Sequence, residues 1–297
     1  MTLSRLPPVR GRLAQAAPLA AMTWFRVGGP AEFLFRPADV DDLCAFLRDL
    51  KLEMPVTVIG AASNLIIRDG GLNGVVIKLA RGFGEVVVEA DGLIVGAAAL
   101  DITVSEHAAA AGLTGLEFLS GIPGTIGGAV AMNAGAYGGD IASVLDWAEI
   151  VTRDGQVQRL GVQELGLSYR HSNLPSDAVV VRVRLRAQAG EMSLIAAQMA
   201  EIKTKREATQ PVRARTGGST FANPDGRKAW ELVDAAGCRG LRKGNAQVSE
   251  LHCNFLLNLG EATASELEAL GEEVRRRVER QSGISLRWEI KRIGVPA

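Results

Sequence analysis

The stretch from Ser120 to Gly138 reads SGIPGTIGGAVAMNAGAYG. It contains six glycines among small neighbours, and it has no Lys, Arg, Asp or Glu. Because glycine costs backbone entropy, such density is typical of a main chain that adopts positive φ, or that lies against a flat anionic group and offers it N–H groups. We therefore predict a loop that wraps around the diphosphate of a dinucleotide. The spacing matches neither the P-loop nor the GxGxxG motif, which indicates a different kind of cofactor site.

A second turn of small residues lies upstream. Val56 to Gly60 is predicted as a buried strand, it leads into Ala61-Ala62-Ser63-Asn64, and a second apolar run covers 65–67. A strand, a small-residue turn and a strand can direct backbone amides and two short polar side chains at one phosphate group. Taken alone, each of these glycine-rich or small-residue turns is more often only a tight turn.

The rest of the chain mixes helices and strands, so the predicted fold class is α+β. Helices are predicted at 39–50, 101–111, 191–206 and 227–236, and another after the capping-box pattern Thr263-x-x-Glu266. Hairpins are predicted at 86–95 and 148–160, with turns at Asp91-Gly92 and Asp154-Gly155, and strands at 178–186, 254–258 and 286–293. The pattern changes near Pro211, so we place the domains at 1–206, with lobes at about 1–80 and 81–206, and at 207–297.

The bulk composition excludes several classes of protein. With 33 basic and 33 acidic residues, the charge favours neither nucleic acid nor an anionic membrane as partner. Cys44, Cys238 and Cys253 share no short spacing, so neither a disulfide framework nor a metal site is predicted. We find no signal peptide and no stretch long enough to span a bilayer, and we expect a cytoplasmic monomer. Arg275 to Arg277 are predicted to lie on a solvated helix face.

Together and in this order, the two turns resemble the FAD-binding domain of the UDP-N-acetylenolpyruvoylglucosamine reductase family, also called UDP-N-acetylmuramate dehydrogenases. The resemblance covers nearly the whole chain and includes Thr23, GGPA at 28–31, YRHS at 169–172, GGSTFANP at 217–224 and LRWEIKRIG at 286–294. It implies a two-part FAD-binding domain of the vanillyl-alcohol-oxidase type over 1–206 and a smaller C-terminal α+β substrate domain. It also implies NADPH-dependent reduction of UDP-N-acetylglucosamine enolpyruvate to UDP-N-acetylmuramate, a step in peptidoglycan precursor synthesis.

The resemblance assigns the FAD contacts to the two turns. They are Gly60, Ala61, Ala62, Ser63, Asn64 and Leu65 in the first, and Gly121, Ile122, Pro123, Gly124, Thr125, Gly127, Gly128, Asn133, Ala134, Gly135, Ala136 and Tyr137 in the second. Ala61 and Ala62 stand where glycine is usual, so the backbone there must either avoid strongly positive φ or tolerate strain.

Arg170 matches the catalytic arginine of the family. A guanidinium group stays charged and binds a carboxylate through two parallel donors, which suits it to the enolpyruvyl carboxylate. From the pattern alone, a surface arginine in a turn is the commoner interpretation.

Ser219 matches the serine that donates the proton in similar enzymes. Serine is a poor acid in water, so this role needs a site that stabilises the alkoxide or that relays a proton. A serine that caps a backbone amide is the commoner interpretation of a Gly-Ser pair, and the adjacent Thr220 is an alternative donor.

Glu289 matches the catalytic glutamate of the family. The match implies that it hydrogen-bonds the substrate carboxylate, as a protonated acid or through water, and stabilises the enol-like intermediate. The alternating pattern around it is otherwise typical of an exposed strand residue.

Tyr169 and Asn223 match substrate-binding positions of the family. Ala222 stands where lysine is frequent, so a contact to the substrate diphosphate is either missing or supplied by Lys205 or Arg206. The chain between Arg186 and Pro211 is too short for the tyrosine loop of the longer subfamily, so the sequence resembles the shorter one.

Two alternatives differ from this interpretation: another FAD-dependent oxidoreductase of the same fold, and a flavin-binding module without catalysis. Covalent flavin in such oxidases often uses His or Cys near the glycine-rich loop, and 120–138 has neither. The presence of Arg170, Ser219 and Glu289 argues against the second alternative.

Overall fold

The computed structural model describes residues 6–297, which form two compact units. The first unit contains 6–16, Phe33–Ala61 and Gly74–Lys205, and the second contains Ala17–Glu32, Ala62–Asn73 and Arg206–Ala297. The sequence placed 1–206 in one continuous domain. Two of its segments instead group with the C-terminal residues, because Phe25, Val27 and Ile66 join the hydrophobic core formed there.

The first unit contains a four-stranded sheet in the order β1 (Arg12–Pro18), β2 (Pro30–Arg36), β5 (Leu72–Ile77) and β3 (Val56–Val58). The helix α1 (Val40–Asp49) starts where the sequence predicts it, since the Asp39 side chain accepts a hydrogen bond from Asp42 N. Its apolar face packs with Phe33 and Phe35 in one core. The predicted strand at Val56 is shorter than expected and ends at Val58.

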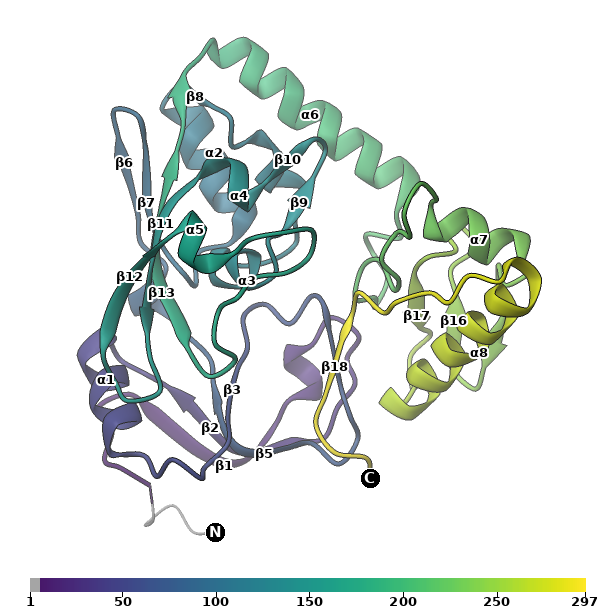
Figure 1. Ribbon diagram of the computed structural model, residues 1–297, viewed down its shortest axis with the longest axis horizontal. Coiled ribbons are helices and arrows are strands. Elements are labelled where there is room, and N and C mark those ends of the chain that lie inside the picture. Colours follow the sequence, from purple (N-terminus) through teal and green to yellow (C-terminus); the bar gives the residue numbers. More distant parts are fainter. Residues whose placement is uncertain (1–5) are drawn as a thin grey trace. The chain divides into compact units, whose positions relative to one another are not determined.

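The first unit also contains a five-stranded antiparallel sheet (Figure 1). Its order is β12 (Val157–Gly161), β11 (Leu145–Val151), β13 (Val179–Arg186), β7 (Gly92–Gly96) and β6 (Val86–Glu89). Both predicted hairpins are confirmed. The first turns one residue early, because Glu89 pairs with Gly92 and leaves Ala90 and Asp91 as the turn.

Helices α2 (Asp101–Ala110) and α3 (Ile126–Ala131) contribute to the core of this sheet, with Val104 and Ile126 fully buried. The predicted helix at 101–111 is thereby confirmed. The shorter elements are η3 (Arg81–Phe83), β8 (Leu113–Thr114), η4 (Glu117–Gly121), β9 (Gly135–Ala136), β10 (Gly139–Asp140), α4 (Ile141–Val144), α5 (Val162–Leu165) and β14 (Gln188–Ala189). The helix predicted at 191–206 is α6 (Met192–Thr209).

The second unit has its own core around α7 (Ala229–Ala235) and α8 (Ala264–Ser282). The predicted capping box is confirmed, because Thr263 Oγ1 accepts from Glu266 N and the Glu266 carboxylate accepts from Thr263 N. The other elements are η2 (Ala20–Met22), the antiparallel strands β15 (Arg242–Lys243), β16 (Ala246–Val248) and β17 (Leu256–Asn258), and the parallel pair β4 (Leu65–Ile67) and β18 (Lys291–Ile293). Figure 1 shows α7, α8, β16 and β17 together.

The predicted strand at 286–293 is wrong over its first five residues. Only Lys291–Ile293 forms a strand, on β4. Before it, the backbone bonds to the segment 220–222, through Ala222 N to Arg287 O and Glu289 N to Thr220 O. The residues around Glu289 are therefore fixed by contacts to the GGSTF segment and not by a regular strand.

Candidate active site

Gly60, at the start of the first small-residue turn, lies against the second turn inside the first unit. A Cβ atom added to Gly60 would lie 2.4 Å from Oγ1 of Thr125. Only glycine therefore fits at this point without moving the second turn.

Backbone strain gathers at the predicted site residues. Among residues 6–297, six residues other than glycine have positive φ, and four of them belong to the predicted site: Ala62 (52°), Asn133 (43°), Tyr137 (52°) and Arg170 (55°). Such conformations cost free energy and are common where a site requires them. For Ala62, the sequence left two options, and the turn adopts the strained one.

The amides at the start of α3 are partly used by the protein itself. Ile126 N donates to Ala99 O at 3.0 Å, and Gly127 N donates to Ala97 O at 2.9 Å. A Cβ atom on Gly127 would lie 3.0 Å from the Ala97 Cβ. The backbone N–H of Gly127 is therefore not offered to a ligand, and its glycine is needed for close packing on the sheet.

Asp101 lies beneath the same loop. Its side chain is fully buried, and a Cβ atom on Gly124 would lie 2.6 Å from Asp101 Oδ2. Neither carboxyl oxygen makes a hydrogen bond of normal geometry among the described residues. Burial raises the pKa of Asp101 to about 8, although the nearby Gly124 N–H opposes part of that shift. A neutral acid here leaves the loop without a negative charge at neutral pH, which fits an anionic diphosphate.

Arg170 is attached to this loop. Its Nη2 donates to Gly135 O at 2.8 Å, and its guanidinium carbon lies 5.1 Å from the centre of the Tyr169 ring. Asn133 Nδ2 donates to Ser168 O at 3.0 Å, and Ser172 Oγ donates to Ala131 O at 2.9 Å. The YRHS segment and the NAGAYG end of the loop therefore form one hydrogen-bonded structure.

The second unit brings Ser219, Glu289 and Asn64 onto neighbouring segments. Glu289 N donates to Thr220 O at 2.8 Å, and Asn64 Nδ2 donates to Glu289 O at 3.3 Å. Ser219 forms an antiparallel bridge with Phe255. Within 6–297 the Ser219 hydroxyl has no hydrogen-bond partner. Arg170 belongs to the first unit.

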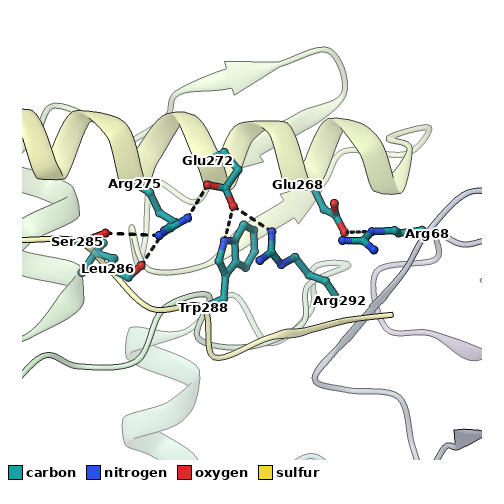
Figure 2. Close-up of polar contacts among 8 residues, drawn as sticks. All are labelled: Arg68, Glu268, Glu272, Arg275, Ser285, Leu286, Trp288 and Arg292. Atoms are coloured by element: carbon teal, nitrogen blue, oxygen red, sulfur yellow. Dashed lines mark hydrogen bonds and ion pairs between the residues drawn. The ribbon is translucent and has the colours of Figure 1, made fainter. Parts of the chain in front are cut away.

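Figure 2 shows a polar cluster around Trp288, the residue before Glu289 in the sequence, that the sequence did not indicate. Glu272 Oε1, on α8, accepts from Trp288 Nε1 at 2.8 Å and from Arg292 Nη1 at 2.9 Å. The Arg292 guanidinium lies 4.4 Å from the centre of the Trp288 ring. Trp288 also pairs with Phe221, which follows Ser219 by two residues. Glu272 therefore holds the ring of Trp288, which connects the segment of Glu289 with the segment of Ser219 through Phe221.

The basic residues of α8 are only partly a solvated face. Arg276 and Arg277 pair with Glu273 on their own helix, as a solvated face predicts. Arg275 is different, because its Nε donates to Leu286 O at 2.7 Å and its Nη1 to Glu272 at 2.7 Å. It ties the segment before Glu289 to the helix. At the other end of the cluster, Arg68 after β4 pairs with Glu268 at 2.9 Å.

The candidate substrate residues have different local roles. Tyr169 is 53% exposed. The Asn223 side chain accepts from Ala229 N at 2.9 Å, so it caps the start of α7. Ala222 is buried, and Lys205 is paired with Glu201 on α6. The described part of the chain has no cluster of residues suited to a metal ion, and none of its helices is long and apolar enough to cross a membrane.

Comparison with known proteins gives two family models and many close relatives. The model described as FAD binding domain matches residues 31–161, and the one described as UDP-N-acetylenolpyruvoylglucosamine reductase, C-terminal domain, matches 210–293. The chain is 66% identical to UDP-N-acetylenolpyruvoylglucosamine reductase of Acidiphilium cryptum, over 98% of this chain and 94% of that protein. It is 67% identical to the enzyme of that name from Granulibacter bethesdensis, over 97% and 93%. The chain belongs to the UDP-N-acetylenolpyruvoylglucosamine reductase family.

Solved structures agree with membership of this reductase family. A UDP-N-acetylenolpyruvylglucosamine reductase from Thermus caldophilus has a TM-score of 0.82 and 36% identity, over 96% of this chain and 99% of that one. A 6-hydroxy-D-nicotine oxidase from Arthrobacter nicotinovorans, at 17% identity, has a TM-score of 0.50 over 61% of this chain and 43% of its own, which shows a shared fold only. The predicted fold and FAD as cofactor are confirmed. The chain is an FAD-dependent oxidoreductase.

Proposed function

We propose that the protein uses NADPH and FAD to reduce UDP-N-acetylglucosamine enolpyruvate to UDP-N-acetylmuramate, in the cytoplasm and as a monomer. The observation that carries the proposal is the attachment of Arg170 to Gly135, because it ties a carboxylate-binding side chain to the glycine-rich loop assigned to the cofactor. We assign FAD binding to 1–206 and substrate binding to 207–297.

The residues of the two turns would hold FAD: the 60–65 turn and the loop from Gly121 to Tyr137. Bound FAD would supply a hydride from its N5 to the methylene carbon of the enolpyruvyl group. The neighbouring carbon then needs a proton, and the negative charge on the carboxylate side needs stabilisation until that proton arrives.

The side chains of this protein supply both requirements in the proposal. Arg170 binds the substrate carboxylate through its guanidinium group. Glu289 donates a hydrogen bond to the same carboxylate, as a protonated acid or through water, and stabilises the enol-like form. Ser219 donates the proton, and its hydroxyl is not engaged by another described residue. Tyr169, Asn223, Lys205 and Arg206 are proposed to contact the nucleotide part of the substrate.

The test separates proton donation from a structural role of Ser219. A Ser219→Ala variant should bind FAD and accept hydride from NADPH normally, yet reduce the substrate about 100-fold more slowly or worse, the usual loss for a positioned acid. Stopped-flow measurement of the two half-reactions reads this split. Ser219→Cys keeps an ionisable group and should recover part of the rate.

Arg170→Lys and Glu289→Gln should also slow flavin reoxidation by substrate and spare reduction by NADPH. Near-normal reoxidation in Ser219→Ala would exclude the serine as donor and leave Thr220 or a water. A loss of about 1 kcal/mol in stability with unchanged turnover would indicate a serine that only stabilises the turn.

A further inference from the structure

Lys78 follows β5 and reaches the first turn of the site. Its Nζ donates a hydrogen bond to Gly60 O, and its backbone N donates to Phe35 O at 3.0 Å. The side chain is half-buried. A cation is therefore held directly on the turn that is assigned to the cofactor diphosphate, although no motif in the sequence indicated this lysine.

The surroundings of Lys78 disfavour its charge. Burial lowers the pKa of Lys78, and the positive charge of Arg36, the last residue of β2, lowers it further. Two neighbouring positive charges raise the local positive potential, which favours the binding of a negatively charged ligand beside the turn.

The hydrogen bond to the Gly60 carbonyl places the charge of Lys78 on the peptide group that also contains the Ala61 N–H. The Gly60 carbonyl and the Ala61 N–H belong to one planar peptide group and point in opposite directions. An ammonium group on the carbonyl oxygen fixes the orientation of this peptide. It also polarises the peptide, so the Ala61 N–H becomes a stronger donor.

We propose that Lys78 is a positioning residue for FAD: it holds the Gly60–Ala61 peptide with its N–H toward the diphosphate and supplies positive charge behind that N–H. The inference rests on the assignment of the 60–65 turn to the diphosphate. The competing explanation is that Lys78 only ties the end of β5 to the turn after β3. In that case the hydrogen bond matters and the charge does not.

The test measures flavin affinity on the full chain after the flavin has been removed by dialysis. FAD and riboflavin are titrated separately, with the quenching of flavin fluorescence as readout, because riboflavin has no phosphate. Lys78→Gln keeps a donor for Gly60 O and removes the charge, Lys78→Arg keeps the charge, and Lys51→Gln removes an exposed lysine of the same unit as a matched control.

Lys78→Gln should weaken FAD binding about 10- to 100-fold, the effect of one unit charge at several ångströms in a partly buried site, and leave riboflavin binding unchanged. Lys78→Arg should stay within about threefold of the parent, and Lys51→Gln should match it. Melting of the flavin-free variants checks that each is folded. If Lys78→Gln does not fold, Lys78→Met replaces it. The inference then requires weaker FAD binding in Lys78→Met and FAD binding equal to the parent in Lys78→Arg.

Two results would overturn the inference: FAD affinity of Lys78→Gln equal to the parent, or an equal loss for FAD and riboflavin. Gly60→Ala tests the assignment of the 60–65 turn to the FAD diphosphate, because the added Cβ would push the turn away from Thr125. If Gly60→Ala also binds FAD normally, the turn does not hold the diphosphate. If only Lys78→Gln is normal, the turn assignment survives and the role of Lys78 is lost.

Discussion

Asp101 carries a carboxyl group in the first turn of α2, buried against Gly124 and without a normal hydrogen bond among the described residues. The acids on neighbouring elements bond elsewhere: Glu117 of η4 to Thr114 and Gly115, and Glu89 of β6 to Arg184. The protonation of Asp101 is therefore set by its own burial. A folded chain that keeps a proton on this group must lose stability when the pH forces the proton off.

The sign of this effect follows from the pKa values. The folded chain holds the Asp101 proton up to its pKa of about 8, whereas an unfolded aspartate loses it near pH 4. Between these values the unfolded chain binds fewer protons, so the free energy of unfolding falls as the pH rises, by about 1.4 kcal/mol per pH unit at most. Asp101→Asn removes this dependence. Its stability relative to the parent should rise from pH 4 to pH 8 in urea unfolding.

An exposed acid provides the control. Asp41→Asn, in the first turn of α1, is the control for the loss of an exposed carboxyl group in the same measurement. If the difference between Asp101→Asn and the parent were constant with pH, the carboxyl group would already be ionised in the folded protein.

Two properties of single residues, backbone conformation and the use of backbone N–H groups, could not be predicted from the sequence. It left the backbone of Ala62 open, because residue type alone does not fix φ for alanine, and the answer came from the fold. It counted Gly127 among the cofactor contacts, but the N–H of that residue is used by Ala97. A glycine-rich pattern cannot distinguish an amide that faces a ligand from one that anchors the loop.

Among the elements, α8 contacts the segment before Glu289 through Glu272 and Arg275. Burial would raise the pKa of Glu272, but hydrogen bonds from Trp288 and Arg275 and the charges of Arg275 and Arg292 outweigh it, so the pKa lies below its usual range. The carboxylate stabilises the fold above that usual range, and this stabilisation is lost as the pH falls and the group takes up its proton.

Glu272→Gln should therefore lower stability by about 1 kcal/mol, a modest value because the carboxylate is partly exposed and screened. It should also slow substrate reduction while FAD content stays normal, since Trp288 loses its charged acceptor beside Glu289. Thermal melts and the two half-reactions measure these effects.

Glu273→Gln is the matched control on the same helix, because Glu273 pairs with Arg276 and Arg277 of α8. It should cost stability without slowing substrate reduction. Equal slowing in both variants would show that loss of α8 stability, and not the position of Trp288, controls the rate.

Elements with a local signal were predicted well. The capping box of α8 lies within four residues in sequence and is confirmed, and α1 begins within one residue of its predicted start. The segment 286–290 was mistaken for a strand because its alternation suits one, whereas its partners at 220–222 are some 65 residues away in the chain, a separation that local pattern does not reveal. The same applies to the Glu272–Trp288 contact, which depends on tertiary packing.

For the whole molecule, we predict that FAD is held without a covalent bond, since the loop 120–138 has no His or Cys to form one. Acid precipitation should release all of the yellow colour into solution. Added FAD should also raise the melting temperature of the flavin-free protein, because a ligand that binds only the folded state stabilises it. Flavin that stays on the acid-denatured chain would contradict the prediction.

The compact units have consequences for gene fragments and domain exchange. Each unit is built from three stretches of chain, so the polypeptide passes between them after Ala16, Glu32, Ala61, Asn73 and Lys205. A fragment that begins at residue 206 lacks Phe25 and Ile66 of its core, and it lacks β4, the partner of β18. Expressed alone, 206–297 should be poorly folded by circular dichroism and quickly digested by proteases. Recombination at a single point would likewise transfer a module without part of its interior, so chimaeras between relatives should need matched exchanges at 17–32 and 62–73 as well.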